Sequence, residues 1–399
     1  MNSMKKKMLM LPLMLMLMLI LALTSTAAGL PINDEYFINI AIGDNENITF
    51  AGHTDSETEG NWIVLKGGTS IKLPSPLTFG YHGINSTTFV SNGKTISVTA
   101  NMENNTDYIV EYPYDKHPMF TNVTGKNDLV IDFYGSNYFA GKGVDVYLIR
   151  TSPSNLKNAV DDLSKGDSSY FRNLGSSSYA TSLNKLLDNK GDFKSMSFGK
   201  LDAGDYVIII LQNTSYLPGA NDLSILSATA FEVLEYDSIM SAPNNAAPDS
   251  TVIVSMSLTD ASVGSYTYGA ILVHESAYKA AIMLESNGTK LGTDLLMNGA
   301  DLIKGFKVSG VGSSNFDSAD ATDIINDVIG ANDGVVTFKT TDSNSTSILL
   351  DTDGLRRVNY VLLVGVYKSG DNLVAFGQSD VTLSSGTPPS PPSSNRRNN

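Results

Sequence analysis

Two stretches of this sequence place a leucine five positions before a tyrosine that opens an unbroken apolar run. They read LDAGDYVIIIL, from Leu201 to Leu211, and LRRVNYVLLVG, from Leu355 to Gly365. In Greek-key sandwiches, a tyrosine near the start of one strand donates its hydroxyl to the backbone a few residues upstream and fixes the crossover between sheets. The spacing therefore predicts structural tyrosine corners at Tyr206 and Tyr360. The alternative is two ordinary buried strands that begin with tyrosine.

Short apolar or alternating runs recur along the chain, and turn signals separate them. In one run Val144, Val146 and Leu148 share a single face, as they would in a half-buried strand. Five runs predict strands: KTISVTA (94–100), DYIVEY (107–112), GVDVYLI (143–149), TVIVSMSL (251–258) and YGAILVHE (268–275). The turn signals are Asn92-Gly93, Asn287-Gly288 and Asp333-Gly334. The predicted fold class is mainly β, with two Greek-key, immunoglobulin-like β-sandwich domains and short inserted helices.

A coarse repeat divides the chain into these two domains. Each half has a helix that ends in glycine, then the leucine-to-tyrosine corner, then closing strands, LSATAFEVL (226–234) in one half and NLVAFGQSDVTL (372–383) in the other. The boundary is predicted at SIMSAPNNAAPDS, where two prolines and small polar residues interrupt the apolar pattern. We therefore expect an N-terminal sandwich over 32–237, a linker over 238–250 and a C-terminal sandwich over 251–384.

Three segments have the spacing of short helices. One runs from Ser152 to a closing Gly166, a second covers 178–190 with Leu183, Leu186 and Leu187, and a third runs from Ser318 to Gly330. The first two form a helical insertion at about 152–190. The runs 207–211 and 361–364 do not alternate, which predicts burial on both faces. Either an inserted helix or the neighbouring domain covers the second face, and we expect the helix to do so.

The two ends of the chain differ from the rest. Residues 1–28 carry three lysines, an apolar run from Met8 to Leu23 and small residues around Ala27, the order of an export signal that is cleaved. The competing reading is an uncleaved membrane anchor. Residues 385–399 are rich in proline and serine, which predicts a disordered tail without a hydrophobic anchor.

Because the chain begins with an export signal, we expect it to be extracellular and open to glycosylation. Seven Asn-x-Ser/Thr sequons are glycosylation candidates, with chance occurrence as the alternative for any one of them: Asn47, Asn85, Asn104, Asn122, Asn213, Asn287 and Asn344. The chain has no cysteine, so disulfides cannot stabilise it and sizeable cores must. Its 27 Lys and Arg against 41 Asp and Glu argue against nucleic acid as a partner.

Several strings in the sequence resemble the methanogen extracellular domain, a family of cell-surface proteins of methanogenic archaea. They are GSYTYGAILVHESAYKAAIMLESNGTKLGTDLLMNG (264–299), NYVLLVGVYKSGDNLVAFGQ (359–378), DFYGSNYFAGKGVDVYLI (132–149) and LDAGDYVIIIL (201–211). The resemblance covers most of the chain after residue 28. It implies an exported archaeal surface or secreted protein of unassigned biochemical role, and it supplies no functional residues.

The sequence contains no convincing catalytic centre. Its four histidines, His53, His82, His117 and His274, lie far apart, and neither a His-Glu-x-x-His nor a Gly-x-Ser-x-Gly motif occurs. Calcium is the better candidate for a bound ion, because Asp351 and Asp353 before Gly354 place oxygen ligands on a turn. The competing reading of that turn is an ordinary polar one. We expect no other cofactor.

Aromatic residues provide the candidate binding site. Proline breaks a strand in DYIVEYPYDKHPMF (107–120), where aromatic side chains can stack on sugar rings or anchor a protein partner. The candidate residues are Tyr108, Tyr112, Tyr114, His117 and Phe120. Core packing at the end of a sandwich is the alternative for these residues.

These observations favour a non-catalytic protein, secreted or associated with the cell envelope, with a structural, adhesive or matrix-binding role. Its expected partner is an envelope component, a polysaccharide or another surface protein, and it would contact the membrane only through an uncleaved N-terminal segment. One alternative is a secreted carbohydrate-active enzyme, which needs two carboxyl groups facing each other across a cleft. Another is a subunit of a surface layer or extracellular filament.

Overall fold

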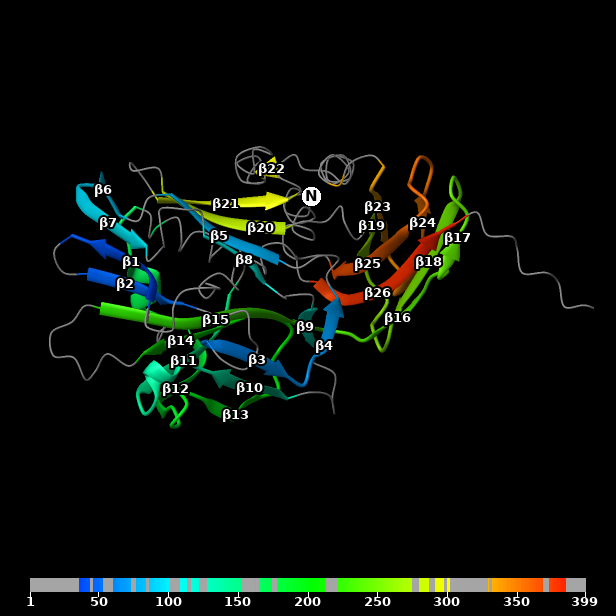
Figure 1. Ribbon diagram of the computed structural model, residues 1–399. Coiled ribbons are helices and arrows are strands. Elements are labelled where there is room, and N and C mark those ends of the chain that lie inside the picture. Colours follow the sequence, from blue (N-terminus) through cyan, green and yellow to red (C-terminus); the bar gives the residue numbers. More distant parts are fainter. Residues whose placement is uncertain are drawn as a thin grey trace, which may run out of the picture.

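A computed structural model shows a mainly β protein whose sheets fall into two units (Figure 1). The export signal at 1–28 and the tail at 385–399 lie outside the described residues. The structure describes residues 36–43, 46–52, 60–72, 77–83, 86–100, 108–112, 116–121, 128–151, 162, 165–173, 178–212, 222–274, 280–286, 291–297, 300–301, 329, 332–368 and 373–384.

The N-terminal unit packs a small sheet against one end of a larger one. The small sheet contains β3 (Trp62–Lys66), β10 (Leu129–Tyr134) and β13 (Phe193–Gly199). The large sheet contains β9 (Lys116–Thr121), β15 (Asp222–Leu234), β14 (Gly204–Gln212), β11 (Gly143–Arg150) and β12 (Ser178–Leu186), in that order. A continuous apolar core fills the space between the two sheets, with Phe133, Ile208 and Phe231 fully buried in it.

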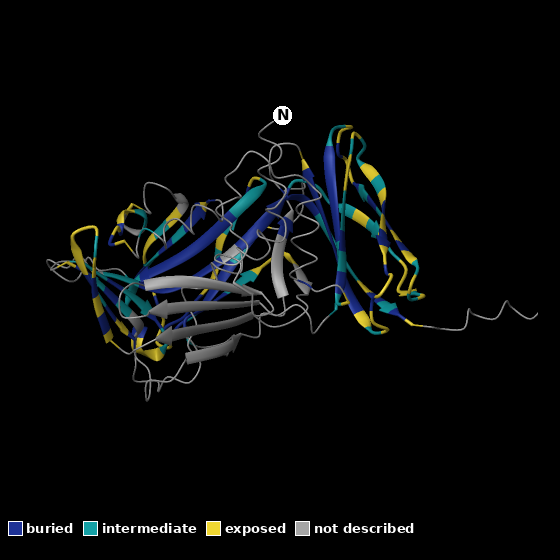
Figure 2. Cartoon of the chain, turned by 90° about the horizontal axis from the view of Figure 1, so that it is seen from above, coloured by how far each residue is buried: buried dark blue, intermediate teal, exposed yellow. Residues whose placement is uncertain are grey.

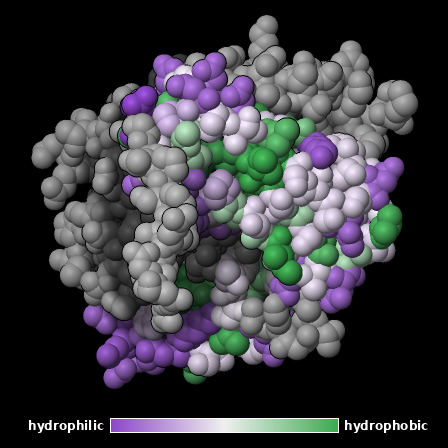
Figure 3. Space-filling model, turned by 90° about the vertical axis from the view of Figure 1, so that its right-hand side faces the viewer, coloured by the Kyte–Doolittle hydropathy of each residue, from purple (hydrophilic) through white to green (hydrophobic). Residues whose placement is uncertain are grey.

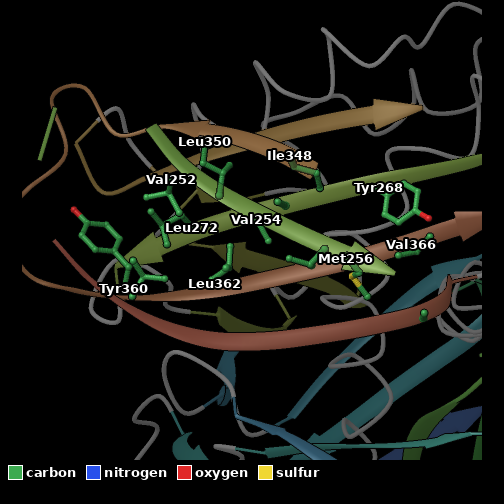
Figure 4. Close-up of a cluster of buried hydrophobic side chains, with 14 of the residues drawn as sticks. Val252, Val254, Met256, Tyr268, Leu272, Ile348, Leu350, Tyr360, Leu362 and Val366 are labelled. Atoms are coloured by element: carbon green, nitrogen blue, oxygen red, sulfur yellow. The ribbon is translucent and has the colours of Figure 1, made fainter. Parts of the chain in front are cut away.

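The C-terminal unit is a second sandwich. One sheet contains β16 (Ser238–Ser241), β18 (Thr251–Leu258) and β24 (Ser345–Asp351). The other contains β17 (Asn245–Ala246), β26 (Leu373–Leu383), β25 (Asn359–Lys368), β19 (Tyr266–His274) and β23 (Gly334–Thr341), in that order. Figure 4 shows side chains such as Val254, Leu350 and Leu362 meeting between the sheets, and Figure 2 shows buried residues alternating with exposed ones along the strands.

The two units pair their strands in the same pattern. In the small sheets, β3–β10–β13 corresponds to β16–β18–β24 in chain order and in pairing. In the large sheets, the last strand of each unit, β15 or β26, pairs in parallel with a short early strand, β9 or β17. The same last strand pairs antiparallel with β14 or β25, the strand that begins with the predicted corner tyrosine. The coarse repeat in the sequence is therefore a repeat of strand pairing.

Each corner tyrosine makes the upstream bond that its spacing predicts. The Tyr206 hydroxyl donates to the Asp202 carbonyl at 2.8 Å, and the Tyr360 hydroxyl donates to the Arg356 carbonyl at 2.9 Å. The leucines that precede them, Leu201 and Leu355, are buried. Both rings are only 1% exposed, so each bond fixes the backbone at the entry of a buried strand.

A third tyrosine makes the same bond, which the sequence analysis did not anticipate. Tyr266 opens β19 and donates to the Ser262 carbonyl at 2.9 Å. The residue five positions before it is Ala261, so the leucine that marks the other two corners is missing. The remaining signal was glycine two positions before the tyrosine, Gly264 here and Gly204 at the first corner.

The helix predicted over 178–190 is wrong, because this segment begins with strand β12. It pairs antiparallel with β11, and this pairing satisfies the backbone hydrogen bonds that a helix would otherwise form internally. Leu183 and Leu186, taken as a helix face, are 59% and 68% exposed at the sheet edge, and only Leu187 is buried. Three leucines at helical spacing were too short a pattern to separate the two structures.

The other two predicted helices fall almost entirely outside the described residues. The regular helix that the structure describes is α3 (Ser169–Arg172), which has four residues, and η3 (Asn137–Phe139) is a single 3₁₀ turn. Among the described residues, no helix is long and apolar enough to cross a membrane. The expectation that helices cover the second face of the corner strands therefore stays a prediction.

The segment predicted to be a linker, residues 238–250, belongs instead to the C-terminal sandwich. It contains β16, paired with β18, and β17, paired with β26. The connection between units shrinks to Glu235–Asp237, and it is bonded to the second unit: the Tyr236 N–H donates to the Val374 carbonyl and the Thr259 N–H donates to the Asp237 carbonyl, each at 2.9 Å. Prolines interrupt these strands without removing them, since β16 ends before Pro243 and β17 is short enough to fit between Pro243 and Pro248.

Further strands surround the first sandwich. A group of four extends its large sheet, because β2 pairs in parallel with β15: β1 (Tyr36–Ile42), β2 (Glu46–Ala51), β6 (Ser86–Ser91) and β7 (Lys94–Ala100). The predicted turn at Asn92-Gly93 joins β6 to β7, and both residues have positive φ, 49° and 76°, as this two-residue hairpin requires. A short strand, β4 (Thr69–Lys72), pairs with β9.

One more sheet combines strands from both halves of the sequence. It contains β8 (Tyr108–Tyr112), β5 (Leu77–Gly83), β20 (Ala280–Ser286), β21 (Leu291–Met297) and β22 (Ala300–Asp301). Strands β5 and β20 pair in parallel across about two hundred residues of chain. The predicted domain boundaries therefore do not isolate the halves, because 280–301 joins strands that precede residue 237.

The tyrosine corners give the first testable prediction. Replacing Tyr206 or Tyr360 with phenylalanine leaves the carbonyl of Asp202 or Arg356 without its donor, so each change should lower the free energy of unfolding by about 1 to 2 kcal/mol. Chemical denaturation measures the loss. Tyr138→Phe, at a ring that is 42% exposed, is the matched control and should stay within about 0.5 kcal/mol of wild type. Corner variants as stable as this control would contradict the structural role.

Candidate functional site at the junction of the two units

The predicted aromatic site is divided between two sheets. Tyr108 and Tyr112 lie on β8, whereas His117 and Phe120 lie on β9 in the large sheet of the first unit. Tyr114 is outside the described residues. Phe120 is 2% exposed and packs edge-on against Phe231 at 5.3 Å, so it is a core residue and not an exposed contact.

At the predicted calcium turn, the carboxylates of Asp351 and of Asp249, a residue outside the turn, accept backbone hydrogen bonds. The Asp353 N–H donates to Asp351 Oδ1 at 3.1 Å, and the Gly354 N–H donates to Asp249 Oδ1 at 3.2 Å. Within the part of the chain that the structure describes, no group of three or more His, Cys, Asp or Glu side chains is placed to hold a metal. Calcium binding at Asp351 and Asp353 stays a prediction.

Two of the seven sequon asparagines are described. Asn47 lies half-buried on β2. Asn344 uses its side-chain Nδ2, the atom that a glycan would occupy, to donate to the Ala261 carbonyl at 3.0 Å. The other five, Asn85, Asn104, Asn122, Asn213 and Asn287, lie outside the described residues.

Two acidic residues are paired on neighbouring strands of the first unit, close to its connection with the second. Asp205 on β14 and Glu232 on β15 are direct partners in an antiparallel pair, so their side chains stand on the same face with Cβ atoms about 5 Å apart. The residues next to them, Tyr206 and Phe231, stack in the core at 5.5 Å. The two carboxyl groups therefore point to the opposite face of the sheet, away from that core.

Burial changes the protonation of both acids. Glu232 is 2% exposed, and its burial, followed by the charge of Asp205, raises the pKa of its carboxyl well above the ordinary value. Burial also raises the pKa of Asp205 to about 7, although the positive charge of Arg150 opposes this shift. Two adjacent acids with raised pKa values share the protons of the pair instead of titrating independently.

The second unit supplies a phenol to this pair. Tyr367 on β25 is 6% exposed, and its hydroxyl has no hydrogen-bond partner among the described residues. Burial, followed by the charges of Glu232 and Asp205, raises the pKa of Tyr367 well above its ordinary value. We call Asp205, Glu232 and Tyr367 the junction cluster.

A salt bridge connects the units beside this cluster. Lys368 Nζ lies 2.9 Å from Glu235 Oε1 and 3.2 Å from the Tyr236 hydroxyl, and Tyr236 packs edge-on against Tyr266 at 6.5 Å. Hydrogen bonds to Glu235 and Tyr236 raise the pKa of Lys368. Burial raises the pKa of Glu235, but hydrogen bonds from Tyr236 and Lys368 outweigh it and lower that pKa overall, so the bridge stays charged.

Arg150 is positioned by the first tyrosine corner. Gly204 has φ +149°. A Cβ atom added at Gly204 would lie only 2.9 Å from Nε of the Arg150 guanidinium, which is too close. The guanidinium also donates to the Ala203 carbonyl. A side chain at position 204 would displace Arg150, so glycine there keeps the cation near Asp205.

The junction cluster can bind and release protons, but its geometry suits other chemistry poorly. Its two carboxyls stand side by side on neighbouring strands instead of facing each other across a cleft, as glycoside hydrolysis needs. A polymeric substrate does not reach Glu232 at 2% exposure. Two carboxylates and a phenol also supply fewer oxygens than the six to eight that calcium prefers.

Sequence reasoning missed this cluster. A usable signal existed in SATAFEVL, where Glu232 stands between Phe231 and Val233 in an apolar strand, because an unpaired charge is rarely fully buried there. Asp205 gave no such signal, because it lies before the apolar run that follows Tyr206. The approach of Tyr367, 135 positions after Glu232, depends on how the units dock, which no local pattern encodes.

Comparison with known proteins adds no relative. No protein-family model matches the chain, and no characterised protein matches it either. The resemblance to the methanogen extracellular domain therefore stays a prediction from the quoted strings.

We expect Asn344 to carry no glycan in protein purified from its native source. Its side-chain Nδ2 donates to the Ala261 carbonyl, and its main-chain carbonyl accepts from the Leu258 N–H. Intact-mass and peptide mass spectrometry measure occupancy. Thr346→Ala is the matched control, since it destroys the sequon and keeps the asparagine. A glycan-sized loss of mass in that variant would refute the expectation.

Asn344→Ala should lower the free energy of unfolding by about 1 to 2 kcal/mol in chemical denaturation, because the Ala261 carbonyl loses its side-chain donor.

Proposed function

We propose that this chain is a non-catalytic structural or adhesive protein, secreted or held at the cell envelope, built from two immunoglobulin-like Greek-key sandwiches. The observation that carries the proposal is the repeated strand pairing of the two units, joined by a bonded connection of only three residues. Such a connection suits a stiff pair of modules that holds its loops at a set distance from a surface.

The immunoglobulin-like assignment is supported by the order and the corners of the strands. In each unit the strand that begins with the corner tyrosine precedes the last strand, the position that this tyrosine takes in such sandwiches. Both units also place a long connection between equivalent strands, after β11 in one and after β19 in the other. Long connections on a repeated scaffold are where binding residues concentrate.

An exposed apolar surface supports contact with a partner. Ile253 on β18 and Leu349 on β24 are direct cross-strand neighbours, and they are 55% and 58% exposed on the outer face of the small sheet. Ile239 on β16 is 67% exposed. Figure 3 shows apolar patches among polar ones on the side of the molecule that faces right in Figure 1. Exposed aliphatic pairs of this kind are common in contact surfaces.

Export supports the location and can be tested directly. We expect the protein in the envelope or extracellular fraction, with a mature N-terminus near Gly29, because cleavage follows the small residues at Ala27 and Ala28. Cell fractionation with mass spectrometry of the N-terminus measures both. Protein that retains Met1 in the cytosolic fraction would contradict export and, with it, the proposed role.

The binding partner can be tested with isolated envelope polysaccharide. Replacing both Tyr112 and Tyr114 with alanine should weaken binding by about tenfold, because ring stacking on sugars is lost. The control is Tyr138→Ala at an exposed ring elsewhere, which should bind as wild type does. Unchanged binding in the double variant would reject this site.

Two other results would favour the alternative functions. Release of reducing sugar by the wild-type protein would favour the carbohydrate-active enzyme, and ordered polymers formed without polysaccharide would favour a surface-layer or filament subunit.

A further inference from the structure

The small sheet of the second unit turns an uncharged face to solvent. In Figure 1, β16, β18 and β24 lie on the side of this unit that is remote from the first unit. Within the described bounds of these strands, Asp351 at the end of β24 is the one charged residue. Strand alternation places the following residues opposite the core, and we call them the uncharged face: Ile239, Ile253, Ser255, Ser257, Ser347 and Leu349.

The central hydroxyls of this face bond to each other. Ser255 and Ser347 are direct cross-strand partners, and their Oγ atoms lie 2.9 Å apart. On one side of this pair stands Ile239, and on the other side stand Ile253 and Leu349. These three aliphatic side chains are 55 to 67% exposed. Because the hydroxyls stay bonded without water, burying the face against an apolar surface costs little and removes three aliphatic side chains from water.

The corresponding sheet of the first unit is different, so an uncharged face is not a general property of the fold. There the outer face of β3, β10 and β13 carries a salt bridge between Lys66 and Asp132. Lys194 Nζ lies 5.0 Å from the centre of the Tyr134 ring on the same sheet. The second unit carries aliphatic and hydroxyl side chains where the first unit carries charges.

We propose that the uncharged face binds the same face of a second copy of this chain and forms a two-fold dimer. The proposed dimer depends on the structural or adhesive role above and gives the protein partner a specific identity. The chain has a net charge of −14, so two copies repel each other, and contact between two uncharged faces brings the fewest like charges together. A two-fold axis that crosses the strands at Ser255 sets Ile239 of each copy over the end that holds Ile253 and Leu349 in the other. The face is therefore complementary to itself.

Neighbouring groups favour packing through the face over pairing at the sheet edge. Lys339 Nζ donates to the Ser347 carbonyl at 2.9 Å, so a lysine occupies part of the edge of β24 where another strand could pair. Asn344, the sequon beside β24, donates its Nδ2 to the Ala261 carbonyl, and we expect no glycan there to shield the face. The described strands of this sheet also carry no aromatic ring to stack on a sugar and no cation, so a polysaccharide suits this face less well than a second copy does.

The size of the face limits the strength of the dimer. Three strands about 4.8 Å apart, each about seven residues long at about 3.4 Å per residue, cover roughly 350 Å². Stable interfaces bury about 800 Å² on each partner. We therefore expect a reversible dimer with a Kd on the order of 10 to 100 µM, which forms where copies are concentrated, as at an envelope surface.

Sedimentation velocity tests the dimer directly. The purified exported chain should shift from monomer to dimer between about 1 and 300 µM. Replacing both Ile253 and Leu349 with lysine should keep it monomeric throughout, because like charges then meet in the contact. Val90→Lys, at a residue that is 71% exposed on β6 of the first unit, is the matched control and should dimerise as the parent does. Ile253→Ser is the second variant if the lysine variant fails to fold, and it should weaken the dimer about tenfold.

Salt and polysaccharide distinguish this contact from others. Raising NaCl from about 0.05 to 0.5 M should strengthen the dimer, because salt screens the repulsion between acidic copies. A parent that stays monomeric, a dimer that persists unchanged in a folded face variant, or weakening by salt would overturn the proposal. So would open polymers in place of dimers, or dissociation of the dimer by envelope polysaccharide. A monomer that still reaches the envelope and binds polysaccharide would contradict the dimer alone and leave the proposed function standing.

Discussion

Two strands, β14 and β25, are buried on both faces, and the arrangement of the molecule depends on this constraint. Along β25, Tyr360, Leu362 and Val364 enter the sandwich core, while Val361 and Leu363 on the other face are buried as well. The facing sheet of a sandwich covers one face only, so the second face needs another part of the chain. Asp205 on β14 and Tyr367 on β25 stand on these second faces, opposite the core residues Tyr206 and Val366.

The local parts of the fold were predictable, because strand periodicity and turn chemistry act over a few residues. The run 94–100 coincides with β7, and Asn92-Gly93 adopts the φ values of the hairpin turn that it predicts. The bonds of Tyr206 and Tyr360 follow from one repeated spacing. The errors were also local in origin: leucines at helical spacing hid β12, and prolines hid β16 and β17.

The long-range parts could not be predicted, because they depend on pairings that no short window contains. The parallel pairing of β5 with β20 and the contact of Tyr367 with Glu232 both join distant segments. The division of the candidate aromatic site has the same origin, since Tyr112 and Phe120 lie close in sequence but belong to different sheets. A buried acid in an apolar strand was the one visible trace of the junction. The sequence does not show that Asp205 lies opposite this acid on the neighbouring strand.

The account rests on Glu232 being protonated when its ordinary chemistry would make it an anion. The direct measurement is the pH titration of its side-chain carboxyl by ¹³C nuclear magnetic resonance, with Asp205 followed in the same spectra. We expect the pair to titrate far above the ordinary range of carboxylic acids, with Asp205 at about 7 and Glu232 well above 4.5. Midpoints at 3.8 for Asp205 and 4.5 for Glu232, the ordinary values, would show that the junction is hydrated and would contradict the account.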